Sequence, residues 1–327
     1  MSVSPSRMVH EELCAGIPRI PASEAFEHED VLSEWLREWL AAHGLVASPT
    51  GWQAIAAIRM PLFTAYYSPI CRSRDDTRLY CAWMTWLHLF DDRFDAAPLS
   101  SDADAAKAVV DHYLETNEAL RSGRPSPAPT DPFARAFADL VSWTSRGAGP
   151  EWRGRLLSEI DVWMRSYPEE TVHRRDGLVL APDELIALKR RCMADPLSLE
   201  LLQRVGTGEL SSPVRVLLDP LVQLTADIKG AINDIASLER ERACGDNHNL
   251  VISLMHHRGL SESQATAEVA HSVRQWVAEL GELARDLAEQ LPPGDERAAA
   301  VSWMAASCSS VRGYHDWLLE TGRYASA

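Results

Sequence analysis

Three aspartates at the end of an apolar stretch could bind a metal ion. Asp91 and Asp95 are four residues apart, so in a helix they share one face, with Asp92 beside them. Carboxylates at a helix C-terminus face the negative end of its dipole and repel one another unless a cation binds among them. Oxygen ligands of this kind select a hard ion such as Mg²⁺. For an isolated cluster a solvated helix end is the simpler interpretation, but the apolar run before it favours a metal site.

A second polar set lies far along the chain. Asn233, Ser237 and Glu241 follow one another at four-residue spacing, so they share a helix face about 12 Å long. Because side chains lean toward the helix N-terminus, Glu241 can reach back toward the other two, and three oxygens could converge on one ion. A polar stripe is usually the solvated face of a helix. However, Asn and Ser are weak helix formers, and this favours a second metal site over a surface stripe.

The elements that carry these residues are predicted to be helices. Residues 79–90 are almost continuously apolar, too long for a strand and too short for a membrane span, which indicates a buried helix. Neither alternating strands nor repeats are evident, so we predict an all-α bundle of roughly a dozen helices. We expect a helix from residue 183 to be interrupted near Ala194, Asp195 and Pro196. The other helices are predicted at residues 31–43, 52–66, 76–95, 103–120, 132–145, 150–166, 212–243, 261–291 and 295–321, with a short one after residue 249 and an irregular segment at 167–182.

Domain organisation follows from where periodicity begins. Residues 1–28 carry prolines, glycine and mixed charge without a helical pattern, and we predict a partly ordered N-terminal arm. Residues 29–327 are predicted to form one domain, because the proline-rich segment 122–130 is too short to be a domain linker.

Composition excludes several classes of partner. The 327-residue chain has a net charge of −15, which argues against nucleic acid or an anionic membrane as the main partner. The six cysteines show no CxxC pair and are expected to be reduced core thiols. We find no signal-peptide pattern and no run of eighteen apolar residues, so we predict a cytoplasmic protein that neither spans a membrane nor is secreted.

Taken together, the two polar sets resemble the metal motifs of bacterial class I terpene synthases. Asp91-Asp92-Arg93-Phe94-Asp95 resembles their aspartate-rich motif, and the later set matches their NDxxSxxxE triad without a mismatch. The order of the motifs and their separation of roughly 140 residues also fit. The resemblance spans about residues 30–325 and includes weaker matches at 188–191, 248–251, 316–317 and 322–324.

The resemblance implies a helical bundle around a central apolar cavity, in which three Mg²⁺ ions clamp the diphosphate of a linear prenyl substrate. It makes Asp91 the main bridging ligand, supported by Asp92 and Asp95, and it gives the third ion to the Asn233, Ser237 and Glu241 triad. Arg190 would correspond to the diphosphate-sensing arginine, with the adjacent Arg191 as an alternative register. The remaining donors to the diphosphate would be Arg240, Arg323 and Tyr324.

The pocket wall is expected to stabilise a carbocation with aromatic faces. The aromatic candidates, each of which could instead be ordinary core packing, are Trp83, Trp86, Phe90 and Trp317. Two departures from the family pattern affect this pocket. Leu87 and His88 stand where relatives often have phenylalanine, and Ala194 stands where a glycine carbonyl is often used.

The implied function is a Mg²⁺-dependent lyase that cyclises a prenyl diphosphate to a sesquiterpene hydrocarbon or alcohol. The length of this protein is typical of bacterial sesquiterpene synthases, which favours the C15 substrate farnesyl diphosphate. The alternative is a diterpene synthase that uses geranylgeranyl diphosphate, and a C10 substrate ranks third. A chain-elongating prenyltransferase would need a second DDxxD, which Asn233-Asp234-Ile235-Ala236-Ser237 does not supply. A non-catalytic helical binding protein would tolerate loss of the ligands, yet all six are present. A homodimer is possible.

Overall fold

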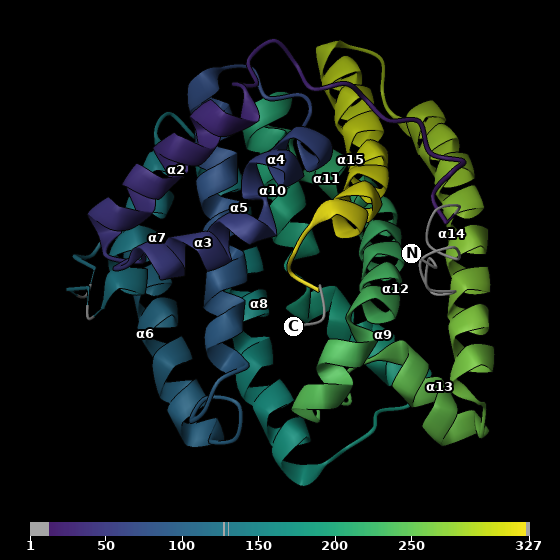
Figure 1. The fold of residues 1–327 in the computed structure, drawn as a ribbon. Coiled ribbons are helices and arrows are strands. Elements are labelled where there is room, and N and C mark those ends of the chain that lie inside the picture. Colours follow the sequence, from purple (N-terminus) through teal and green to yellow (C-terminus); the bar gives the residue numbers. More distant parts are fainter. Residues whose placement is uncertain (1–12, 127, 130, 325–327) are drawn as a thin grey trace.

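The computed structural model describes residues 13–126, 128–129 and 131–324, and across these residues the protein is all-α, as predicted. The described residues form helices and no strand (Figure 1). The helices are α2 (Glu29–His43), α3 (Pro49–Ile58), α4 (Met60–Tyr67), α5 (Arg74–Phe94), α6 (Ala103–Ser122), α7 (Pro132–Ser145), α8 (Pro150–Asp176), α9 (Pro182–Cys192), α10 (Asp195–Gly206), α11 (Ser212–Leu217), α12 (Asp219–Cys244), α13 (Leu250–Arg258), α14 (Glu262–Gln290) and α15 (Asp295–Glu320).

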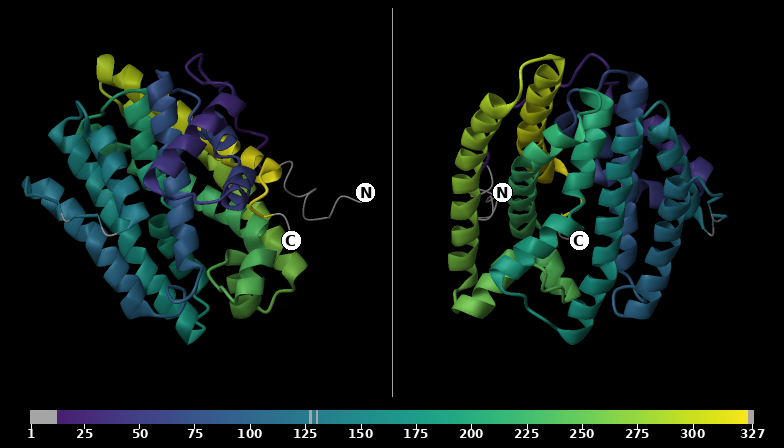
Figure 2. Two further views of the ribbon diagram at one scale, coloured as in Figure 1. Left: turned by 60° about the vertical axis from the view of Figure 1, so that its left-hand side comes forward. Right: turned by 180° about the vertical axis from the view of Figure 1, so that it is seen from behind.

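The helices form a bundle with an inner and an outer set. In Figure 1, α6 and α7 lie at one side and α14 at the other, with α5, α8, α10, α12 and α15 between them. The view from behind in Figure 2 shows the same order reversed. Helix α14 packs on α12, α13 and α15, whereas α6 packs on α8 and α7 on α5. The outer helices therefore support the inner ones, which surround the centre of the molecule.

Helix α5 is the element that positions the aspartate cluster. It starts where the Ser73 hydroxyl accepts a hydrogen bond from the Asp76 amide, 3.1 Å away, and aspartates in its first turn suit the helix dipole. One of its faces carries Trp83, Trp86 and Phe90, which are completely buried against aromatic side chains of α6, α7 and α8. The opposite face turns toward the centre of the bundle and ends in the three aspartates.

Helix α8 is longer than predicted. It continues through Pro168 to Asp176, where we expected an irregular segment. Proline removes one backbone hydrogen bond and costs a helix about 3 kcal/mol. Here that cost is offset by burial, because Tyr167 and Thr171 on the same turn are buried and the Thr171 hydroxyl donates to the Leu99 carbonyl at 3.0 Å. Tertiary packing therefore carries the helix past the proline.

Two other stretches that were predicted to be helical each contain two helices in the structure. The one predicted at 52–66 splits into α3 and α4 at Arg59, whose φ of 58° lies in the left-handed region. The Arg59 guanidinium is held there by Glu29, at 3.0 Å, and by Glu320, at 3.1 Å. The helices predicted at 212–243 are α11 and α12, which meet at Leu218, two residues before Pro220. The predicted break between α9 and α10 is confirmed, and Ala194 adopts a φ of 53° there.

The segment before α2 is packed on the bundle where it is described. Leu13, Cys14 and Ile17 are buried, and the Ile20 amide donates to the Ser309 hydroxyl on α15 at 2.9 Å. Residues 1–12 of the predicted arm lie outside the described residues. All six cysteines are free thiols, and most are shielded from solvent, although Cys244 is exposed. Among the described residues, no helix is both long and apolar enough to cross a membrane.

Trp86 provides a test of this packing. Its ring contacts Phe90, Tyr113 and Phe137, and its indole N–H donates to the Phe133 carbonyl at 3.1 Å. Trp86→Ala should therefore lower the free energy of unfolding by about 3 to 5 kcal/mol, and Trp86→Phe by less. Urea denaturation followed by circular dichroism measures both. A Trp86→Ala variant as stable as the wild type would contradict this assignment to the core.

Candidate active site

A cavity of about 190 Å³ lies between the inner helices. Helices α5 and α12 form facing walls of the cavity, and each helix runs from the closed end of the cavity toward its mouth. Along α5 the lining residues are Met84, Leu87, His88, Asp91 and Asp95, which span about 16 Å of helix axis. Along α12 they are Lys229, Asn233, Ser237, Arg240, Glu241 and Cys244. Asp91, Asp95 and all three residues of the second set therefore line the same cavity, whereas Asp92 lies beside the lining.

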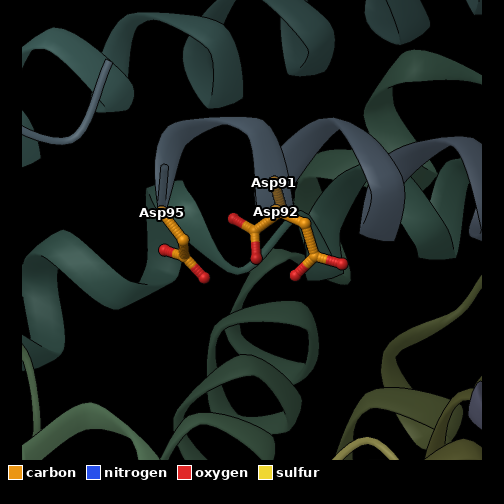
Figure 3. Close-up of side chains that lie close together, drawn as sticks. All are labelled: Asp91, Asp92 and Asp95. Atoms are coloured by element: carbon orange, nitrogen blue, oxygen red, sulfur yellow. The ribbon is translucent and has the colours of Figure 1, made fainter. Parts of the chain in front are cut away.

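The aspartate cluster is compact. Each of Asp91, Asp92 and Asp95 offers a carboxylate oxygen within 4.8 Å of the others. Figure 3 shows the three carboxylates on the same side of the last turn of α5. This spacing allows oxygens from different carboxylates to bind the same hard divalent cation.

The environment of the cluster favours added positive charge. Burial, reinforced by the neighbouring Asp95, raises the pKa of Asp91 to about 7. Burial also raises the pKa of Asp95. Asp92 is the exception, because Arg323 and Arg240 outweigh its burial and lower its pKa. A cation between the carboxylates would relieve the cost of ionising Asp91 and Asp95 together.

The second set is preorganised by hydrogen bonds. The Ser237 hydroxyl donates to one Glu241 carboxylate oxygen at 2.8 Å, and the Asn249 amide donates to the other at 2.7 Å. Burial raises the pKa of Glu241 to about 7, although Lys189 opposes the shift. The Asn233 amide nitrogen donates to the Tyr314 and Tyr324 hydroxyls, at 3.0 and 2.9 Å, so its oxygen remains available as a ligand.

Two arginines form ion pairs with the aspartate cluster. Arg240 of α12 contacts Asp95 at 2.8 Å and Asp92 at 3.3 Å, so it links the two facing walls. Arg323, after α15, makes a two-pronged contact with Asp92 at 2.8 and 3.0 Å.

Arg323 also carries a polar atom that suggests a ligand. Its side chain is only 7% exposed, and its Nε has no hydrogen-bond partner among the described residues. Leaving such a donor unpaired in a buried site is costly. An oxyanion that enters the cavity mouth would satisfy it, so the donor set fits a metal-bound diphosphate.

The sensor region differs from the expectation. The Arg190 guanidinium donates two hydrogen bonds to the Asp227 carboxylate, both at 2.7 Å, and Arg191 forms an ion pair with Glu169. Neither arginine lines the cavity. The side chain of this turn that does line the cavity is Lys189, which is buried and bonded to Asp234. Successive residues of a helix point about 100° apart, so the register of a run of basic residues cannot be read from its composition.

The aromatic lining also differs from the prediction. Trp83, Trp86 and Phe90 belong to the packed face of α5, and Trp317 is buried with its N–H on the Ile58 carbonyl at 2.8 Å. None of these four lines the cavity. Leu87, His88 and Ala194 do line it. The aromatic residues of the cavity wall are Phe63, Tyr67, Trp163, Tyr314 and Tyr324.

Several mouth residues were not identified from the sequence. Arg174 lies near Asp95 at 3.8 Å and bonds Asp246 at 2.7 Å, but it belongs to the part of α8 that was predicted to be irregular. Tyr167, from the same missed turns, donates to Asp91 at 3.2 Å. A helical pattern extended through Pro168 would have placed Arg174 and Tyr167, seven residues apart, on the same face of α8.

The closed end of the cavity is not wholly apolar. The ammonium of Lys229 donates to the Asp195 carboxylate, the Tyr67 hydroxyl and the Ser310 hydroxyl at 2.7, 2.6 and 2.8 Å. These three bonds use all the hydrogens of the ammonium. The group is therefore an internally satisfied ion pair that bounds the cavity.

Known proteins share this fold and these motifs. The family model described as terpene synthase family 2, C-terminal metal binding, matches residues 82–279. The chain is 30% identical to (-)-delta-cadinene synthase of Streptomyces clavuligerus, over 88% of each chain. It is 24% identical to germacrene A synthase of Nostoc punctiforme, over 97% of this chain and 96% of that one. The crystal structure of α-eudesmol synthase superimposes with a TM-score of 0.80 at 26% identity, covering 94% and 98% of the two chains.

The chain therefore belongs to the bacterial class I terpene synthase family. It is a terpene cyclase, a lyase that acts on prenyl diphosphates. The family model and the aspartate cluster together imply that it binds a divalent metal.

Metal affinity should depend on pH. The pKa values of Asp91 and Glu241 are raised by burial to about 7, so below pH 7 a metal ion must displace protons from these carboxylates. We expect affinity for Mg²⁺ or Mn²⁺ to rise between pH 6 and pH 8, by up to about tenfold per pH unit for each proton released. Isothermal titration calorimetry at pH 6, 7 and 8 measures this. Asp91→Asn should weaken the pH dependence, and an affinity that falls with pH would contradict the assignment.

The two arginine positions can be compared directly. Arg323→Gln should lower kcat/KM by about 10²-fold or more, because it removes buried donors at the cavity mouth. Arg190→Gln should lower it by less than about tenfold, since its partner Asp227 lies outside the cavity lining. Continuous measurement of diphosphate release gives both values. An Arg190→Gln variant as impaired as Arg323→Gln would restore Arg190 as the sensor.

Proposed function

We propose that this protein is a Mg²⁺-dependent cyclase that converts farnesyl diphosphate to a sesquiterpene hydrocarbon or alcohol and releases diphosphate. One observation carries this proposal: at a single cavity with aromatic side chains in its wall, the aspartates are hydrogen-bonded to Arg240 and Arg323, and Asn233 of the other ligand set is hydrogen-bonded to Tyr314 and Tyr324. A terpene synthase needs this juxtaposition of an ionising group and an enclosed hydrocarbon site.

The ligand sets would hold three Mg²⁺ ions. Asp91, supported by Asp92 and Asp95, would bind on one side, and the Asn233, Ser237 and Glu241 triad on the other. Bound Mg²⁺ supplies neutralisation of the charge that develops on the departing diphosphate. These residues fit Mg²⁺, because they offer carboxylate, amide and hydroxyl oxygens. The raised pKa values of Asp91 and Glu241 also show that nearby basic residues do not fully offset the burial of these two carboxyl groups.

The basic residues have a second role once the carboxylates bind metal. Arg240 and Arg323 are now partners of Asp92, and a cation among the aspartates would weaken these ion pairs. Their guanidinium groups could then donate to diphosphate oxygens, with Tyr324 adding a neutral donor. Lys189, rather than Arg190, is the basic residue of α9 that faces the cavity, and we assign it to the same group. Each donor strengthens as charge grows on the leaving group.

The cavity wall protects the resulting cation from water. Faces of Phe63, Trp163 and Tyr314 can each stabilise positive charge by roughly 0.5 to 2 kcal/mol. The Lys229–Asp195 pair at the closed end has no net charge, so it does not repel the cation strongly.

A C15 substrate is supported by the relatives. The printed name of a relative from Streptomyces viridochromogenes, 28% identical over 303 residues, is 7-epi-alpha-eudesmol synthase ((2E,6E)-farnesyl diphosphate cyclizing).

The proposal is tested by turnover. Purified protein with Mg²⁺ and farnesyl diphosphate should yield one or more sesquiterpenes by gas chromatography and mass spectrometry, with geranyl and geranylgeranyl diphosphate as chain-length comparisons. Asp91→Ala and Asn233→Ala should each lower diphosphate release by about 10²-fold or more. Asp75→Ala is the matched control, because Asp75 is exposed in the first turn of the same helix, α5. Full turnover in both ligand variants would contradict the proposed site.

A further inference from the structure

His88 carries a nitrogen whose state can be deduced from geometry. Its Nδ1 lies 2.8 Å from the Met84 carbonyl, one turn earlier on α5. A carbonyl can only accept, so Nδ1 carries the hydrogen, and in the neutral ring Nε2 must then hold a lone pair. The ring lines the cavity, and Nε2 has no hydrogen-bond partner among the described residues. The cavity wall therefore carries an acceptor at the position of His88.

Tyr314 supplies a complementary donor. Its oxygen accepts from the Asn233 amide at 3.0 Å, and its hydrogen has no acceptor among the described residues. Tyr314 and His88 contact the same two aromatic rings. The centroid of Trp317 lies 5.6 Å from His88 and 5.8 Å from Tyr314, and that of Phe63 lies 5.6 and 6.4 Å from them. The free acceptor of α5 and the free donor of α15 thus flank one part of the cavity wall.

This part of the wall lies just inside the diphosphate end of the cavity. His88 is three residues before Asp91, which corresponds to about 4.5 Å of helix axis. Tyr314 touches Asn233 of the second ligand set. A carbocation formed below the metal site would therefore lie within reach of both side chains.

We propose that His88 and Tyr314 hold the water molecule that ends the reaction, so that the product is a terpene alcohol. This inference rests on the proposed cyclase function and specifies its outcome. The water donates one hydrogen to His88 Nε2 and accepts from the Tyr314 hydroxyl. Its oxygen lone pair forms a C–O bond with the cationic carbon, the O–H bond to the imidazole breaks, and the proton moves to Nε2. The imidazolium returns its proton to solvent when the product leaves.

The surroundings favour this use of the histidine. Burial, aided by the nearby Arg323, lowers the pKa of His88 to about 4, so the ring is neutral at pH 7 and keeps its lone pair. At the closed end of the cavity, the Lys229 ammonium donates all its hydrogens to Asp195, Tyr67 and Ser310. Among the described lining residues Glu170 and Asn233 also have a free oxygen, but the first is a carboxylate and the second is a proposed metal ligand, whereas His88 offers a neutral base.

The test uses the full-length protein with Mg²⁺ and farnesyl diphosphate in H₂¹⁸O. Two variants of His88 and one control distinguish the role of the Nε2 atom from that of the volume of the side chain. His88→Asn keeps an amide that can bond the Met84 carbonyl but does not reach the Nε2 position, whereas His88→Gln extends an amide oxygen toward it. His43→Asn is the matched control, because His43 makes the same bond to the carbonyl four residues earlier, that of Trp39, at 2.9 Å, and does not line the cavity. Products are identified by mass spectrometry, and diphosphate release is measured in the same samples.

We expect the wild type and His43→Asn to form an alcohol that contains ¹⁸O. In His88→Asn the share of alcohol should fall by about tenfold or more in favour of olefins, with continued release of diphosphate, and His88→Gln should restore part of it. Tyr314→Phe should also lower the share of alcohol, which provides a second test if a His88 variant does not fold.

Two results would overturn the inference. One is a wild-type product that is purely hydrocarbon, and the other is an unchanged alcohol share in His88→Asn. Absence of diphosphate release by the wild type would instead contradict the proposed cyclase itself.

Discussion

Three carboxylates at the C-terminus of α5 repel one another, and the arrangement of positive charge in the site follows from this repulsion. Asp91, Asp92 and Asp95 lie close together, and burial and the helix dipole oppose negative charge on Asp91 and Asp95, which line the cavity. In the ligand-free protein Arg240 and Arg323 supply positive charge, one from the facing helix and one from the chain after α15. These ion pairs therefore join the facing walls. In the proposed function, the same arginines would become available to a diphosphate once metal ions bind the carboxylates.

A second constraint separates packing from chemistry on each inner helix. One face of α5 is an aromatic surface that includes Trp83, Trp86 and Phe90, and its opposite face lines the cavity with Leu87, His88 and Asp91. Helix α12 is divided in the same way, with Ile232 buried and Asn233 facing the cavity. Rigid packing on one face holds the polar groups of the other in position, as the stabilisation of developing charge requires.

Sequence reasoning predicted the fold correctly, and it predicted which residues of the two proposed ligand sets share a helix face, because each depends on local spacing. Four-residue intervals place Asn233, Ser237 and Glu241 on one face whatever the helix packs against. It failed where the outcome depends on tertiary contacts. Burial around Tyr167 carries α8 through Pro168, and the direction in which α9 faces makes Lys189 rather than Arg190 the cavity residue. Aromatic residues beside a motif could not be divided into wall and core until their neighbouring helices were known.

The measurement that tests this account most directly is a crystal structure with Mn²⁺ and inorganic diphosphate, in which anomalous scattering locates the ions. The account predicts ions bound by Asp91 and by the Asn233, Ser237 and Glu241 triad, with Arg323 turned from Asp92 to a diphosphate oxygen. A structure in which diphosphate binds while Arg323 stays on Asp92 and no ion contacts Asp91 would contradict it.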